Sequence, residues 1–102
     1  GLFKVDHSKQ RISLLAPAGE ISLELTTNEY KLLHYFICHE DHLLSRSQIL
    51  DRVWGNDVHV SDRTVDSHIY SLRKKLGPAS SFIETVPRSG YRFLQGKLDQ
   101  AS

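Results

Sequence analysis

The residues with the clearest chemical potential lie in the stretch SDRTVDSHIYSLRKKL, residues 61–76. Its apolar residues recur at spacings of four, three and four, the period of a helix that buries one face; they are Val65, Ile69, Leu72 and Leu76. At about 100° per residue, the outward side carries hydrogen-bonding and charged groups with little apolar bulk. The groups on that side are Arg63, Ser67, Tyr70, Ser71 and Lys74.

This outward surface suits the major groove of double-stranded DNA. The groove admits one helix, and its base edges present donors and acceptors that Arg, Ser, Tyr and Lys side chains can meet. We therefore predict base readout from these five residues. Arg73 and Lys75 flank them, where they can contact phosphates and fix the register without reading sequence. Charge alone leaves open an alternative, a solvated helix face without a partner.

Basic residues are concentrated in the last third of the chain. Residues 61–97 contain seven Lys or Arg against three acidic residues, whereas residues 1–60 contain six against eight. The net charge of the whole chain is only +1. Because the field near a surface follows the nearby charges, the local excess is the feature that would attract a polyanion.

Composition indicates one soluble globular domain. The chain has 102 residues, of which 39% are hydrophobic and 25% charged, enough for a single core. It has neither an apolar run of the ~18–20 residues that cross a bilayer nor a signal peptide at its start. A single cysteine, Cys38, excludes an internal disulfide, so we expect a reducing, cytoplasmic location.

The elements that must position residues 61–76 are short. Residues 2–25 read as strands of a small antiparallel sheet, at 2–5, 11–15 and 21–25, the last with alternating apolar and polar residues. Capping boxes at Thr26 with Glu29 and at Ser45 with Gln48 predict the starts of two helices.

The third helix and the end of the chain complete a winged arrangement. Ser61 is the expected cap of the third helix, and Gly77 with Pro78 ends it. Residues 82–86 and 91–94 read as two strands joined by a basic turn. Two helices before the basic helix and a hairpin after it predict an α+β fold, a helix-turn-helix with a wing.

Four motifs carry a family resemblance: LTTNEYKLL, SRSQILDRVWG, RTVDSHIYSLRKKL and IETVPRSGYRF. In this order they resemble the DNA-binding effector domain of OmpR/PhoB-type response regulators. The resemblance covers residues 2–94 and implies a winged helix-turn-helix with an N-terminal antiparallel four-stranded sheet, three helices and a C-terminal β-hairpin wing. We place the domain at 1–96 (sheet 2–25, helical core 26–77, hairpin 82–94) and a tail at 97–102.

The resemblance also implies roles for single residues. Arg63, His68 and Arg73 match positions that hold the DNA backbone, and Trp54 and Thr85 match further phosphate contacts. Asp66 matches a structural acid. The loop that touches RNA polymerase in the family corresponds to Asn56, Asp57, Val58, His59 and Val60.

The wing, residues 85–92, departs from the family. It reads VPRSGYR where a common pattern is VRGxGYR, so Arg88, with Ser89, is the candidate for the minor groove although it sits one place later. A similar VP wing occurs in membrane-anchored ToxR-like regulators, which have no receiver domain. The full-length protein could therefore be a response regulator or a ToxR-like regulator, and we favour the response regulator. Such a protein has an N-terminal receiver domain under phosphorelay control and binds promoter direct repeats as a head-to-tail homodimer.

Other functions have weaker support. A cluster at helical spacings could hold zinc or copper; its members are His34, Cys38, His39 and His42. A metal site needs three or four converging ligands, and the sequence has no second ligand set. Packing is the favoured role of Cys38. Catalytic motifs are missing, so we expect no enzyme and no cofactor. A protein-docking module is disfavoured, because the cores of protein–protein interfaces are depleted of lysine whereas the outward side of residues 61–76 is basic.

Overall fold

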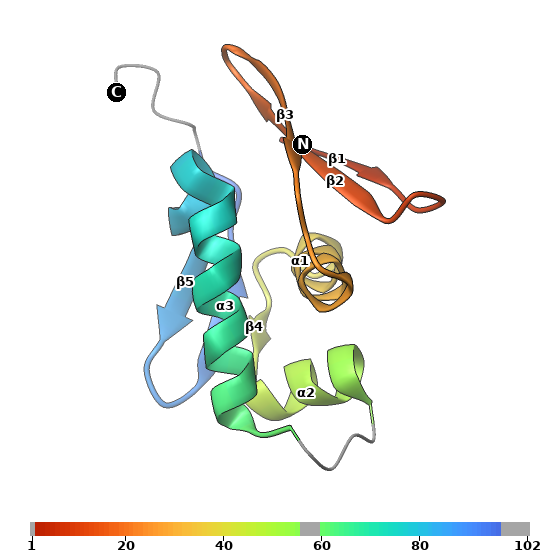
Figure 1. Cartoon of the computed structure of the whole chain (residues 1–102). Helices are drawn as coiled ribbons and strands as arrows, with labels where there is room; N and C mark the ends of the chain where they lie inside the picture. The colour runs from red at the N-terminus through yellow and green to blue at the C-terminus, as the bar shows by residue number, and fades with distance from the viewer. Residues whose placement is uncertain (1, 56–59, 97–102) are drawn as a thin grey trace.

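The computed structural model describes residues 2–55 and 60–96 of the chain. Strands β1 (Phe3–Asp6), β2 (Arg11–Ala16) and β3 (Gly19–Leu23) come first, followed by helix α1 (Thr27–Cys38). Strand β4 (Leu43–Leu44) precedes helices α2 (Arg46–Trp54) and α3 (Asp62–Leu76). A 3-10 turn, η1 (Gly77–Phe82), leads to strands β5 (Ile83–Val86) and β6 (Gly90–Phe93). These elements confirm the predicted α+β winged helix-turn-helix (Figure 1).

The N-terminal sheet is antiparallel, with strand order β1-β2-β3. Strands β1 and β2 lie within one residue of their predicted bounds, whereas β3 was predicted at 21–25 and runs from Gly19 to Leu23. The fourth strand implied by the family resemblance is not found among the described residues, because the chain leaves the sheet after Leu23 to enter the cap of α1. The alternation in β3 is also imperfect: Ile21 is 43% exposed, although its partner Leu14 is fully buried.

Both predicted capping boxes are present. The backbone N–H of Glu29 donates to Thr26 Oγ1 at 3.2 Å, and the Thr26 N–H donates to Glu29 Oε1 at 2.9 Å. In the second box the Gln48 N–H donates to Ser45 Oγ at 3.1 Å, and the Ser45 N–H donates to Gln48 Oε1 at 2.8 Å. Each box satisfies a donor that the first turn of a helix leaves free, which is why α1 and α2 begin at the predicted residues.

Helix α3 begins and ends close to its predicted limits. The Ser61 N–H donates to Thr64 Oγ1 at 3.2 Å, and Gly77 follows the helix at φ +55°, a conformation that favours glycine. The predicted strand at Phe82 starts one residue later, at Ile83. Phe82 instead ends η1 and is buried.

The C-terminal hairpin is part of a larger sheet than the sequence predicted. Its order is β4-β6-β5, with Leu44 opposite Tyr91. Strand β4 connects α1 to the cap of α2, so it ties the wing to the first helix of the helix-turn-helix. The wing is hereafter residues 83–93, and its turn lies beside the first half of α3 (Figure 1).

One apolar core joins the helices to both sheets. The α3 stripe is buried throughout: Val65, Ile69, Leu72 and Leu76 are each at most 1% exposed. An aromatic cluster in the core surrounds Phe93, whose ring centre is 5.9 Å from that of Phe36 and 5.8 Å from that of Phe3. Burying the stripe fixes which side of α3 faces solvent.

Candidate nucleic-acid interface

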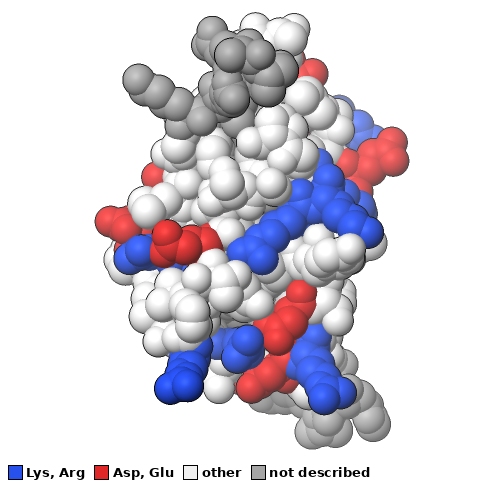
Figure 2. Space-filling model, turned by 90° about the vertical axis from the view of Figure 1, so that its left-hand side faces the viewer, with Lys and Arg blue, Asp and Glu red and all other residues white. Residues whose placement is uncertain are grey.

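The outward side of α3 is accessible along its length. We call the exposed residues Arg63, Ser67, Tyr70 and Lys74 the outer arc. Tyr70 is 62% exposed, and Lys74 Nζ lies 4.5 Å from the centre of its ring. Ser71, at the border of the arc, is half-buried. Figure 2 shows Lys and Arg atoms spread over the side of the molecule that carries α3 and the wing, with acidic atoms between them.

Arg73 joins α3 to the base of the wing. Its Nη2 atom donates to the Ile83 carbonyl at 2.6 Å and to Thr85 Oγ1 at 2.8 Å. The guanidinium also lies 5.8 Å from the ring centre of Tyr91. The structure therefore brings together Arg73 and Thr85, two of the residues for which the sequence predicted phosphate contacts, one from α3 and one from the wing.

The tip of the wing is a tight turn with an arginine in a left-handed conformation. The Ser89 N–H donates to the Val86 carbonyl at 3.0 Å, which closes the turn around Pro87 and Arg88. Arg88 has φ +66° and is exposed. Proline followed by a residue with positive φ is the pattern of a type II turn, where glycine or asparagine is usual.

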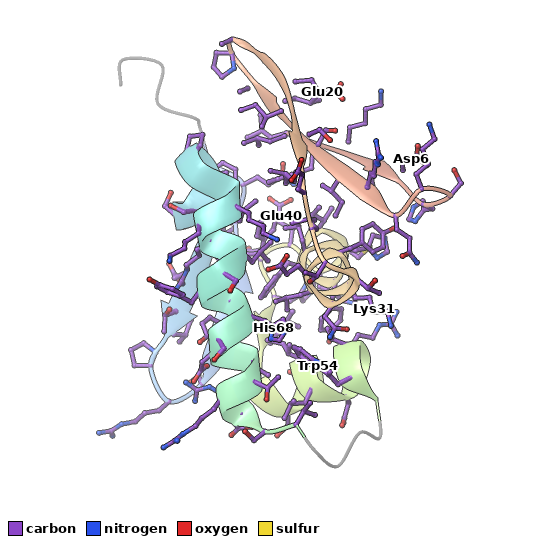
Figure 3. All side chains as sticks on the ribbon, in the orientation of Figure 1. Asp6, Glu20, Lys31, Glu40, Trp54 and His68 are labelled. Carbon is purple, nitrogen blue, oxygen red and sulfur yellow. The ribbon has the colours of Figure 1, made fainter. Side chains whose placement is uncertain are left out.

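Trp54 and His68 form a contact between the end of α2 and α3. Their ring centres are 4.9 Å apart at an interplanar angle of 75°, an edge-to-face arrangement (Figure 3). His68 Nδ1 lies 2.9 Å from the Thr64 carbonyl oxygen. Both rings are half-buried, so each retains accessible atoms at the flank of α3.

A charged network fixes α3 relative to α2 and the wing. Asp66 accepts a hydrogen bond from Arg46 Nε at 2.9 Å and another from the Tyr91 hydroxyl at 2.6 Å. Burial raises the pKa of Asp66, but these two bonds outweigh it and hold the pKa below its ordinary value. Burial and the nearby Asp66 raise the pKa of Tyr91. This geometry agrees with a structural acid at position 66.

Arg46 is the residue that sequence reasoning missed. It lies in the first turn of α2, its guanidinium is 6.0 Å from the Tyr91 ring centre, and its side chain remains 38% exposed. Its cation thus joins Arg73 around the same aromatic ring. Arg46 and Asp66 are twenty residues apart in the sequence, so no local spacing predicts their contact. The order of the family motifs was the one sequence feature that could have indicated a role for Arg46.

Lys75, for which the sequence predicted a phosphate contact, is engaged in an ion pair with α1. Its ammonium pairs with Glu29 Oε1 at 2.5 Å, and the Glu29 side chain is only 4% exposed. Burial raises the pKa of Glu29, but the bonds from Lys75 and from the Thr26 N–H outweigh it, so the pKa falls below its ordinary value. A buried carboxylate requires a cation, which assigns Lys75 to packing of α3 against α1.

The remaining predictions fall on other parts of the chain. Within the predicted polymerase loop, residues 56–59 lie outside the described residues, and Val60 is half-buried. His34 Nε2 and Cys38 Sγ are 3.5 Å apart on α1, and the described residues contain no group of three or more candidate metal ligands. In the parts described, none of the helices has the length and apolar character to span a membrane.

An exposed helix rich in donors, flanked by a hairpin with a cationic tip and held on a compact helical core, defines a winged-helix DNA-binding domain. The chain belongs to the family described as "Transcriptional regulatory protein, C terminal", whose model matches residues 20–93. It is a C-terminal DNA-binding domain of the OmpR/PhoB response-regulator type, as the sequence motifs predicted.

Known proteins support this assignment. Over 78 residues the chain is 50% identical to the phosphate regulon transcriptional regulatory protein PhoB of Escherichia coli (strain K12), covering 74% of this chain and 34% of that protein. The response regulator AdeR DNA-binding domain, solved in complex with an intercistronic region, superposes with a TM-score of 0.81 at 27% identity, covering 93% of this chain and 96% of that one.

A second solved complex is similar. The Klebsiella pneumoniae RstA DNA-binding domain, in complex with the RstA box, has a TM-score of 0.76 at 28% identity, covering 92% of each chain. The present chain spans about a third of the length of the curated relatives it matches.

Proposed function

We propose that this chain binds double-stranded DNA in a sequence-specific manner and thereby regulates transcription. Helix α3 enters the major groove with its outer arc toward the base edges, and the wing tip approaches the adjacent minor groove through Arg88 and Ser89. The observation that carries the proposal is the exposure of Arg63, Tyr70 and Lys74 on one side of a helix whose other side is fully buried.

Phosphate contacts surround the outer arc in this proposal. Arg73 and Thr85 bind the backbone from the base of the wing, and Trp54 and His68 bind it from the flank near α2. Arg46 replaces Lys75 in the set. Both cations pair with a carboxylate and are similarly exposed, at 38% and 36%, but Glu29 is buried and needs its cation, whereas Asp66 is 42% exposed and is also bonded to Tyr91. Thr85 on the wing and Trp54 at the end of α2 thus contact the backbone on the two sides of the reading helix.

The whole protein is proposed to be a cytoplasmic response regulator. An N-terminal receiver domain controls the present domain, two copies bind direct repeats head to tail, and residues 56–60 contact RNA polymerase. Identity of 50% to a PhoB protein favours this arrangement over a ToxR-like membrane anchor, which the VP wing alone would suggest. Sequencing the segments on either side of this chain distinguishes the two parents.

Selection of bound duplexes from a random library tests the proposal. We expect a recurring motif, and tighter binding of that motif than of a scrambled duplex. For contacts with Z phosphates, log K should fall with log salt at a slope of about −0.9Z. Tyr70→Ala should reduce discrimination between the two duplexes, while Arg46→Ala should weaken both about equally.

Two results would contradict the proposal. A salt-independent interaction would indicate a docking module instead, since phosphate contacts release counterions. Equal weakening of selected and scrambled duplexes by Tyr70→Ala would remove Tyr70 from base readout. Lys31→Ala is a suitable control, because this exposed α1 residue lies outside the proposed interface.

A further inference from the structure

The hydrogen bond of His68 determines which of its nitrogens carries a proton. Nδ1 lies 2.9 Å from the Thr64 carbonyl oxygen, and a carbonyl oxygen can only accept. Nδ1 must therefore be the donor. Neutral imidazole has a single N–H, so in the neutral form of His68 the other nitrogen, Nε2, has a lone pair and no hydrogen.

This arrangement conflicts with a phosphate contact by neutral histidine. Phosphate oxygens accept hydrogen bonds and carry negative charge, so a bare Nε2 would be repelled. Imidazolium has a hydrogen on both nitrogens and can donate to Thr64 and to phosphate together. We propose that DNA binding takes up a proton at His68, which makes the proton a ligand bound together with the duplex; the inference rests on the proposed function.

Among the residues that the structure describes, the charged groups near His68 are paired with others or exposed, so the proposal assigns this coupling to the phosphate. The neighbour from α2 is the uncharged Trp54 ring, whose centre is 4.9 Å from that of His68. On α3 the charged residue two turns onward is Lys75, which is paired with Glu29 of α1. Near Trp54 on α2, Asp51 and Arg52 are both exposed and of opposite charge. Among the described residues His68 forms no ion pair with a carboxylate.

The test measures the dissociation constant for a selected duplex at pH 6, 7 and 8 and constant ionic strength. We expect the wild-type affinity to weaken about tenfold from pH 6 to pH 8, the contribution of one charge-assisted hydrogen bond. His68→Gln presents an amide N–H at every pH. Its affinity should therefore be flat and, at pH 8, higher than that of the wild type.

Another histidine of the chain provides a matched control. His39 Nδ1 lies 3.0 Å from the Tyr35 carbonyl oxygen, and its ring makes an edge contact with Tyr35 at 4.7 Å. It has the same local chemistry as His68 but lies at the end of α1, away from the outer arc. His39→Gln should keep the wild-type pH dependence.

Calorimetry in two buffers with different ionisation enthalpies gives a second readout, the number of protons bound. Near pH 7 we expect proton uptake for the wild type and none for His68→Gln. A wild-type affinity that does not change with pH, or a pH dependence that survives in His68→Gln, would overturn the inference while leaving DNA binding intact. Absence of binding at every pH would overturn the proposed function as well.

Discussion

At the scale of the residue, Arg88 occupies a backbone conformation that suits glycine better. A left-handed conformation costs a residue with a side chain about 1–2 kcal/mol, and Arg88 has φ +66° at the exposed tip of the wing. The side chain gains no hydrogen bond or ion pair within the described residues that would offset this cost. The backbone strain at Arg88 is thus not offset by contacts within the domain. This agrees with a role of its cation in binding a partner, which we propose to be the minor groove of DNA.

Arg88→Gly separates stability from binding. Removing the side chain relieves the strain, so the free energy of unfolding should rise by about 0.5–1 kcal/mol after the entropy cost of glycine. Affinity for DNA should nevertheless fall, because the wing loses its cation. Chemical denaturation and a DNA titration on the same preparation measure the two effects.

Gln10→Gly is the matched control for this variant. Gln10 also has positive φ, +51°, and is exposed in the turn between β1 and β2, on the sheet remote from α3. It should gain stability without changing affinity. Unchanged DNA affinity in Arg88→Gly would exclude Arg88 from the interface.

At the scale of the element, Gly90 determines how closely the wing approaches the helix-turn-helix. It begins β6 at φ +136°, and a Cβ atom there would lie 2.1 Å from the Leu44 carbonyl oxygen of β4. Real Cβ atoms do not approach a backbone oxygen so closely. Because Leu44 directly precedes the cap of α2, any shift of β6 would also move the helix that holds Arg46.

Gly90→Ala is therefore expected to destabilise the domain by about 3 kcal/mol or more, through both backbone strain and the clash. Gly19→Ala separates the two causes. Gly19 has nearly the same φ, +138°, but a Cβ atom there would meet nothing within 4 Å, so its substitution should cost only about 1 kcal/mol. Urea denaturation measures both. Equal losses of stability in the two variants would show that β4 shifts readily and relieves the clash with the new Cβ atom.

At the scale of the whole molecule, two carboxylates connect elements that are far apart in sequence. Glu29 links α1 to α3 through Lys75, and Asp66 links α3 to α2 and β6. The pKa of each is lower in the folded chain than its ordinary value. Their contribution to stability is therefore complete above the ordinary carboxyl pKa of about 4, and it is lost as pH falls through the lower folded value.

The free energy of unfolding should accordingly decrease in acid. Glu29→Gln should lower stability by roughly 1–2 kcal/mol at pH 7, because a buried acceptor of Lys75 loses its charge. This difference from the wild type should shrink toward pH 3. Asp66→Asn should behave in the same direction, with a smaller effect since its side chain is 42% exposed.

Denaturant titrations between pH 3 and pH 7 measure these effects. Asp51→Asn serves as the control, since Asp51 is exposed and has no ion pair among the described residues. It should follow the wild-type curve. A pH dependence that stays the same in both Glu29→Gln and Asp66→Asn would locate the acid sensitivity elsewhere in the chain.

The amino-acid sequence by itself determined the helices and the outer arc. Capping at Thr26 and Ser45 and the stripe from Val65 to Leu76 act over three or four residues, so their effect is readable from local spacing alone. Because this stripe is buried, Arg63, Tyr70 and Lys74 must lie on the solvent-facing side of α3. The family motifs added the wing and the class of protein, both confirmed.

Only the tertiary structure decided which cations remain available. Lys75 and Glu29 are 46 residues apart, and Arg46 and Asp66 are 20 apart, so no local pattern pairs them. The two-residue strand β4 likewise exists only because β6 lies beside it. Such contacts depend on where the core places each element, and they removed Lys75 from the proposed interface and added Arg46.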